Sequence, residues 1–102
     1  MKIHPIEAGN FKLDGGAMFG VVPKVLWQKT NPADSNNMID MGSRCMLIEA
    51  SDRLVLIDVG MGDKQSKKFF RHYHRWGGFD LKASINNAGF SCDEITDVFF
   101  TH

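Results

Sequence analysis

The chain has 102 residues, the length of one small domain. Hydrophobic residues make up 43% and charged residues 24%, a composition that excludes a disordered chain, since disordered chains lack the apolar surface that offsets the entropy of ordering. Lys and Arg balance Asp and Glu at 12 each, so the formal net charge is zero, and neither a nucleic-acid-binding surface nor a polybasic membrane patch is expected.

Residues 1–7 contain no apolar run of the kind that begins a secretory signal, and no stretch approaches the ~20 apolar residues that cross a bilayer. The two cysteines, Cys45 and Cys92, are far apart, whereas small disulfide-stabilised domains need more of them. We expect two free thiols, with Cys45 buried, in a soluble cytoplasmic protein.

The first third of the chain is predicted to be an extended segment followed by a long loop. Residues 2–13 have an extended pattern, and Asp14-Gly15-Gly16 is typical of a tight turn, because glycine supplies the positive φ that such turns need. An apolar stretch at 17–22 ends at Pro23, and loop-forming residues dominate 23–43. The Trp and Met side chains in this loop either form an apolar wall for a ligand or partner or fold back into the core. The sequence leaves both alternatives open.

Residues 44–50 and 53–59 are predicted to be two strands. The two-residue connection Ser51-Asp52 predicts an antiparallel hairpin. Each strand contains a continuous apolar run, at 45–48 and 54–57, and such runs are typical of strands that are covered on both faces. The pattern therefore favours a layered α/β fold.

A helix is predicted from Asp63 or Ser66 to about Trp76, where Gly77-Gly78 ends it. Its apolar stripe consists of Phe69, Tyr73 and Trp76, and its basic side chains form a solvated face.

A second helix is predicted to begin after Asp80 and to stop at Gly89. Its apolar stripe consists of Leu81, Ile85 and Ala88. Ser91 and Glu94 have the spacing of a capping box for one short turn, and residues 96–101 are predicted to be the last strand.

Two residues at strand ends are candidates for chemistry. Asp58 follows the apolar run 54–57 and either serves a site or closes an Asx turn with its own backbone. His102 follows the apolar run 98–100 and is either a site residue or a solvated histidine. His72 and His74 fall inside the first predicted helix, where side chains two positions apart diverge by roughly 200°, so we expect no shared metal.

Four segments carry a family resemblance: 11–27, 45–49, 56–64 and 95–102. The most specific are Gly-Gly-Ala-Met-Phe-Gly at 15–20 and Thr-Asp-Val-Phe-Phe-Thr-His at 96–102. In this order they resemble the N-terminal part of a metallo-β-lactamase-fold hydrolase, most closely the lactonase and esterase-like branch.

The resemblance implies the N-terminal half of an αββα sandwich, an α/β fold with a mixed, mostly antiparallel sheet, so that residues 1–102 form an incomplete single domain. It implies that His102 is the first metal ligand of an HxHxDH motif, and that Asp58 supports the ligand loop without binding metal. It also implies that Met18, Phe19 and Pro23 contact the substrate. The implied cofactors are two divalent transition-metal ions, above all zinc, in the complete protein.

The implied activity is attack on an ester or lactone carbonyl by a metal-bound hydroxide. One imidazole cannot hold a catalytic zinc, so this chain alone is expected to be inactive and to need a complementary C-terminal polypeptide, whether the chain is nicked, truncated or a natural fragment. The expected partner is a small-molecule ester or lactone, with homo-oligomerisation open. The alternatives are a non-catalytic module that pairs through its exposed sheet, and a thiol- or phosphodiester-directed member of the same superfamily.

Overall fold

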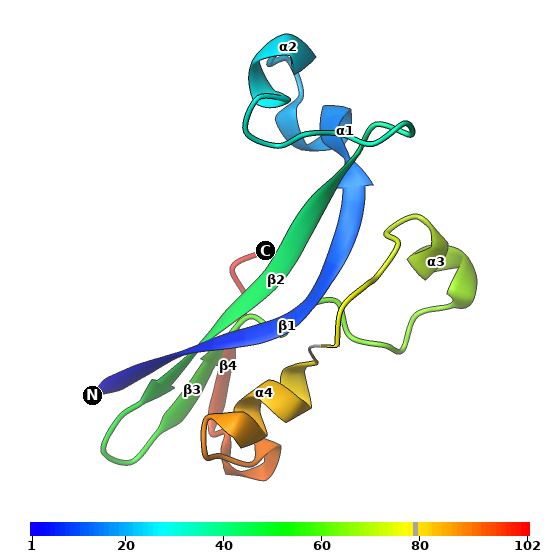
Figure 1. Ribbon diagram of the computed structural model, residues 1–102. Helices are drawn as coiled ribbons and strands as arrows, with labels where there is room; N and C mark the ends of the chain where they lie inside the picture. Colours follow the sequence, from blue (N-terminus) through cyan, green and yellow to red (C-terminus); the bar gives the residue numbers. More distant parts are fainter. Residues whose placement is uncertain (79) are drawn as a thin grey trace.

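The computed structural model describes residues 1–78 and 80–102 and shows a mixed α/β fold built on one four-stranded sheet (Figure 1). The strands are β1 (Lys2–Asp14), β2 (Met38–Glu49), β3 (Leu54–Ile57) and β4 (Asp97–Phe99), in that order across the sheet. β2 is antiparallel to both β1 and β3, and β4 is parallel to β3. The predicted fold class, including the mostly antiparallel pairing, is confirmed.

The hairpin of β1 and β2 is much longer than the two strands beside it. Its pairing runs from Lys2↔Glu49 to Asp14↔Met38, whereas β3 reaches along β2 only from Glu49 to Met46. The hairpin therefore continues past the end of β3 as a two-stranded arm. At its end the arm carries residues 15–37, which we call the tip lobe and which contain α1 (Gly15–Phe19) and α2 (Lys24–Trp27) (Figure 1).

The tip lobe begins with a helix cap, and the predicted tight turn at 14–16 is wrong. The Asp14 carboxylate accepts hydrogen bonds from the backbone N–H groups of Gly16 and Ala17, at 2.7 and 3.2 Å. Glycine is needed at position 15 for space rather than for φ, because a Cβ there would lie 2.3 Å from the Trp27 ring. Asp14 is therefore an N-cap, as Asp commonly is.

The apolar residues of this region differ in their burial, and a role as a wall for a ligand or partner stays a prediction. Trp27 is buried and stacks on Phe19 with ring centroids 5.0 Å apart, so it folds back within the lobe. Val21 and Leu26 stay exposed. The predicted loop 23–43 is also too long, since α2 lies inside it and β2 already begins at Met38.

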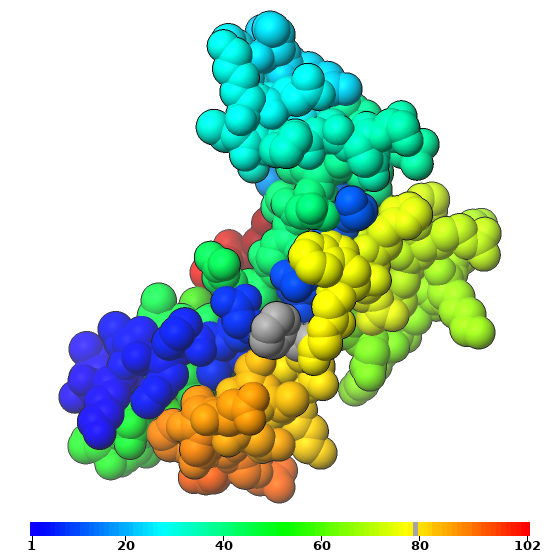
Figure 2. Space-filling view, in the orientation of Figure 1, coloured from blue at the N-terminus to red at the C-terminus, as the bar shows by residue number. Residues whose placement is uncertain are grey.

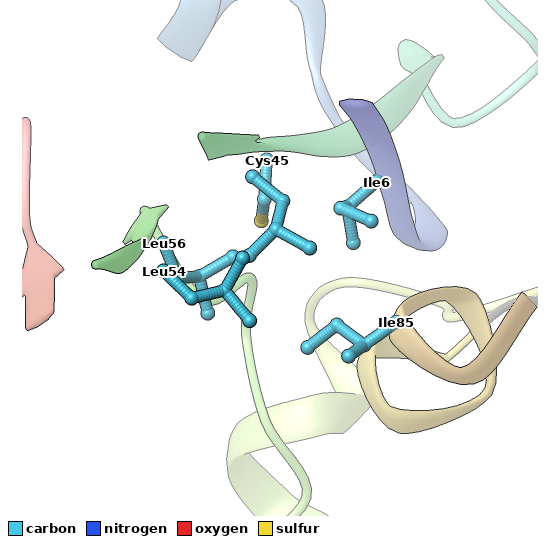
Figure 3. Close-up of a cluster of buried hydrophobic side chains, with 6 residues drawn as sticks. Ile6, Cys45, Leu54, Leu56 and Ile85 are labelled. Atoms are coloured by element: carbon cyan, nitrogen blue, oxygen red, sulfur yellow. The ribbon is translucent and has the colours of Figure 1, made fainter. Parts of the chain in front are cut away.

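One face of the sheet is covered by α4 (Leu81–Asn87) and forms the core (Figure 3). Asp80 caps this helix by accepting from Ala83 N–H at 2.7 Å, and Ile85 is fully buried against the sheet. Each buried aliphatic side chain stabilises the fold by roughly 1.5–3 kcal/mol. The core consists of Ile6, Cys45, Leu47, Leu54, Leu56 and Ile85.

The other face of the sheet is apolar and largely uncovered by the described residues. Strand register and the alternation of side chains place six residues there: Ile3, Met46, Ile48, Val55, Ile57 and Phe99. We call this set the open face. Phe99 is 60% exposed and Ile3 58%. The predicted cover on both faces is thus not found among residues 1–78 and 80–102, where burial alternates along β3.

The first predicted helix is shorter than expected. α3 spans Lys67–Arg71, and its cap Ser66 accepts from Phe69 N–H as predicted. The helix ends early because His74 has a left-handed φ of 41° and the chain then follows the outer edge of β1, where Trp76 N–H donates to the Asn10 carbonyl. The stripe predicted for a helix ending near Trp76 is therefore wrong, and Phe70 is the buried ring.

The last quarter of the chain follows the predictions closely. Gly89 ends the second helix region with a φ of 96°, and Ser91 with Glu94 forms the expected capping box around η1 (Cys92–Glu94). The predicted final strand is present as β4, but it spans Asp97–Phe99 rather than 96–101. None of the helices in the described part of the chain has the length and apolar character needed to cross a membrane.

Candidate functional site

The carboxyl ends of β3 and β4 lie next to each other, because the two strands are parallel and Ile57 pairs with Phe99. The residues that follow each strand therefore meet at one edge of the sheet, as is common for sites in α/β folds. Asp58 leaves β3 there, and Thr101 and His102 follow β4. The structure thus brings the strand end of Asp58 beside that of His102.

Asp58 holds Thr101 with both carboxylate oxygens. Oδ2 accepts from the Thr101 hydroxyl at 2.6 Å and Oδ1 accepts from the Thr101 N–H at 2.9 Å. The Asp58 N–H donates to the Phe99 carbonyl at 2.8 Å. The Thr101 hydroxyl, then its N–H, and the nearby charge of His102 lower the pKa of Asp58 below its ordinary value.

This arrangement argues against one of the two sequence interpretations of Asp58, the Asx turn. Its partner is Thr101, 43 positions away, rather than its own backbone, so an Asx turn does not account for it. Because both oxygens accept hydrogen bonds from Thr101, the carboxylate is occupied in supporting the β4 exit. Asp58 also adopts a left-handed φ of 64°, which is uncommon for a residue other than glycine.

Sequence reasoning missed Thr101. The signal was present, because a threonine sits directly before the candidate ligand and at the end of the strand that runs parallel to the one ending at Asp58. The parallel pairing of these two strands, which joins residues about 40 positions apart, was needed to see it.

His102 is exposed, and an imidazole at a strand end is a suitable metal donor. A catalytic zinc takes about three protein ligands. Within residues 1–78 and 80–102, no three His, Cys, Asp or Glu side chains are grouped so that they could hold a metal ion. In that part of the chain, His102 is therefore an exposed imidazole at a strand end that belongs to no group of three such side chains.

Cys45 lies behind this edge, inside the core. Burial raises the pKa of the Cys45 thiol, and the charge of Asp58 adds to the shift. A thiol with a raised pKa stays protonated near neutral pH, so Cys45 is suited to packing rather than to nucleophilic attack. Cys92 is exposed, and both cysteines are free, as predicted.

The residues expected to contact substrate lie in the tip lobe. Met18 is 44% exposed at the surface of α1, Phe19 stacks on Trp27, and Pro23 is the N-cap of α2. The arm that carries them extends past the ends of β3 and β4, so the lobe stands beyond the same edge of the sheet as Asp58 (Figure 1).

A cavity of about 700 Å³ lies elsewhere, on the side of the sheet that carries the helices. Its walls include the β1 bulge at Gly9, Val59, Met61 and Trp76, and neither Asp58 nor His102 lines it. We therefore give it no part in the candidate site.

His72 and His74 are exposed, and the segment between them is not helical, so the argument from helical spacing does not apply to them.

Solved structures of the same fold include the two that follow. A probable metal-dependent hydrolase from Staphylococcus aureus matches 99% of this chain with 36% identity and a TM-score of 0.88. AidC, a dizinc quorum-quenching lactonase solved with a product, N-hexanoyl-L-homoserine, matches 98% of this chain with 23% identity and a TM-score of 0.66. The second likeness shows the fold alone.

The chain spans 37% of the length of the first of these proteins and 32% of the second. No family model and no curated protein sequence matches the chain.

Proposed function

Since the chain has the fold of an N-terminal portion of a metallo-β-lactamase-fold metallo-hydrolase, we propose that it forms part of a metal-dependent hydrolase that acts on an ester or lactone carbonyl. The observation that carries the proposal is the edge formed by Asp58, Thr101 and His102, in a chain 36% identical to a probable metal-dependent hydrolase. Residues 1–102 then form the N-terminal part of one metallo-hydrolase domain.

In this proposal, His102 donates one imidazole nitrogen to the metal site and Asp58 holds the strand end that presents it. Two divalent ions, with zinc proposed as the metal, would supply a nucleophile at neutral pH and polarise the carbonyl. Both Asp58 oxygens accept hydrogen bonds from Thr101, which supports the proposal that this carboxylate orients its neighbour rather than binding the metal.

The remaining ligands would come from polypeptide outside residues 1–102, which span about a third of the two structural neighbours. The same polypeptide would cover the open face. Phe99 and Met46 on this face are 60% and 41% exposed, and burying each would stabilise the assembled protein by roughly 1.5–3 kcal/mol.

We propose an apolar small-molecule ester or lactone as substrate. The support is the tip lobe, where Met18, Phe19 and Pro23 stand beyond the edge that carries Asp58, and where Met18 is exposed. The free thiols of Cys45 and Cys92 support a reducing compartment such as the cytoplasm.

A second candidate is a binding module that pairs with another polypeptide through the open face without catalysis. The specific observation that favours it is the incomplete ligand set within the described residues. The two candidates differ in whether the assembled protein binds metal.

The test uses the full-length protein, with metal content measured by mass spectrometry and hydrolysis measured on a lactone and on an aryl ester. We expect about two metal ions per protein and measurable hydrolysis. His102→Ala should lose metal and activity together, with activity falling at least 100-fold, whereas His72→Ala, at an exposed position after α3, should leave both unchanged.

A full-length protein that binds no transition metal would reject the hydrolase and favour the binding module. Normal metal content in His102→Ala would reject His102 as a ligand.

A further inference from the structure

We propose that Thr101 is a positioning residue, which fixes the direction of the His102 side chain by attaching the end of β4 to Asp58. The inference rests on the proposed function for its consequence at the metal, but its structural basis is independent of any metal. It concerns the three residues that follow β4, from Phe100 to His102.

The pairing of β4 with β3 ends before these residues. The last pair in register is Ile57↔Phe99, and the Asp58 N–H to Phe99 carbonyl bond closes the ladder at 2.8 Å. Phe100, Thr101 and His102 are all exposed, and Phe100 is 68% exposed. Packing by the described residues therefore contributes little to holding this segment.

Hydrogen bonds hold it instead. Among residues 1–78 and 80–102, the bonds made by residues 100–102 are the two from Thr101 to Asp58, at 2.6 Å from the hydroxyl and 2.9 Å from the backbone N–H. Hydrogen bonds to an ionised carboxylate are shorter and stronger than neutral ones. Two bonds from one residue to the two oxygens of one carboxylate fix both its side chain and its backbone.

Threonine suits this role better than other residues with a hydroxyl group. Its branched Cβ restricts χ1, so the hydroxyl loses less freedom when it bonds Asp58. Its N–H is fixed by the same acceptor, which orients the backbone at Thr101, directly before His102. The next side chain, His102, then leaves the strand in a defined direction.

The test uses the full-length protein and Co²⁺ as the probe metal, with affinity and the visible absorption band both measured. Thr101→Val removes the hydroxyl and keeps the branched shape, and it should weaken Co²⁺ binding about 10–100-fold and shift the band. Thr101→Ser keeps the hydroxyl and should restore affinity to within about threefold of the parent.

A double-mutant cycle identifies the partner through which Thr101 acts. Asp58→Ala should weaken Co²⁺ binding, and Thr101→Val added to it should cause little further loss, because the hydroxyl then has no acceptor. If instead the two losses multiply, the role through Asp58 is overturned.

Thr96→Val is the matched control at the other end of β4. The Thr96 hydroxyl bonds the Leu54 carbonyl and Asp97, far along the strand from His102. Thr96→Val should therefore lower the melting temperature without changing Co²⁺ affinity. A Thr101→Val protein with parental affinity and an unshifted band would overturn the proposal.

Amide hydrogen exchange in the metal-free full-length protein separates this inference from the proposed function. The Thr101 amide should be protected in the parent and should exchange at least tenfold faster in Asp58→Ala. If the parent protein binds no metal, the proposed hydrolase function is rejected, but the exchange rates still test whether Asp58 holds Thr101. Equal exchange rates in the parent and in Asp58→Ala would overturn that contact.

Discussion

Two threonines flank β4, and each donates its hydroxyl to an aspartate. Thr101 donates to Asp58 after the strand, and Thr96 donates to Asp97 at its start, at 2.7 Å. Arg53 also donates to both oxygens of Asp97, at 2.8 and 3.0 Å. These hydrogen bonds favour the ionised form of both carboxyl groups. They also connect β3 to β4 at both ends of this short parallel pair.

The Asp97 contacts predict a specific pH dependence of stability. The Thr96 hydroxyl and then Arg53 lower the pKa of Asp97, so its contribution is present above the pKa of the unfolded chain and is lost as pH falls through the folded pKa. Asp97→Asn should therefore be less stable than the parent at pH 7, and the difference should shrink below about pH 4.

Urea unfolding of the full-length protein at several pH values measures this. Asp52→Asn, in the hairpin turn, serves as the control and should follow the parent at every pH. A difference for Asp97→Asn that stays constant down to about pH 2 would contradict the assignment.

The segment that follows β3 shows how closely the loop after Asp58 approaches β1. Gly60 has a φ of 72°, and a Cβ there would lie 2.8 Å from the Cβ of Ala8. Gly62 has nearly the same φ, 70°, but a Cβ added there would meet nothing within 4 Å. The two glycines therefore share a backbone requirement and differ in steric surroundings.

Alanine substitutions at Gly60 and Gly62 separate the cost of a left-handed backbone from the cost of a steric contact with Ala8. Gly62→Ala should cost about 1–2 kcal/mol of unfolding free energy from the left-handed backbone alone. Gly60→Ala should cost about 1–3 kcal/mol more, because Ala8 must move. Denaturant unfolding of both variants measures the difference, and equal losses would show that the contact with Ala8 yields without strain.

The helices and strands were predicted from local signals in the sequence. The features that the prediction missed depend on contacts between residues far apart in the chain. The caps at Ser66 and Asp80 and the stop at Gly89 depend on a few neighbouring residues, and all three are confirmed. The early end of α3 depends on the pairing of Trp76 with Asn10, and the role of Gly15 depends on Trp27. Such contacts leave no periodicity in the sequence.

In the candidate site, too, some residues were visible from local sequence and one required a long-range contact. Asp58 and His102 were visible because each follows an apolar run, and the parallel pairing in the structure brings these two strand ends together. His102 as a metal ligand and Asp58 as the support of the ligand loop stay predictions. Thr101 was missed because its partner is 43 positions away and its contact requires the parallel pairing of β3 with β4.

At the scale of the whole molecule, the chain is extended. Its radius of gyration is 16.0 Å, compared with about 13 Å for a typical domain of 100 residues. The space-filling view shows the tip lobe and the segment around α3 projecting from the rest of the molecule (Figure 2). Only one face of the sheet carries a helix layer among the described residues, so the open face has the character of an interior surface without its second layer.

Phe99 tests whether the full-length protein supplies that layer. Phe99 is 60% exposed on the open face, and truncating a side chain that exposed should cost about 0.5 kcal/mol or less. If further polypeptide buries it, as the proposed function requires, Phe99→Ala in the full-length protein should cost about 3–5 kcal/mol. Val21→Ala, at a fully exposed position of the tip lobe, is the control and should cost about 0.5 kcal/mol or less. Urea unfolding measures both variants, and equal small losses would mean that the open face remains solvated and that the second half of the sandwich does not pack there.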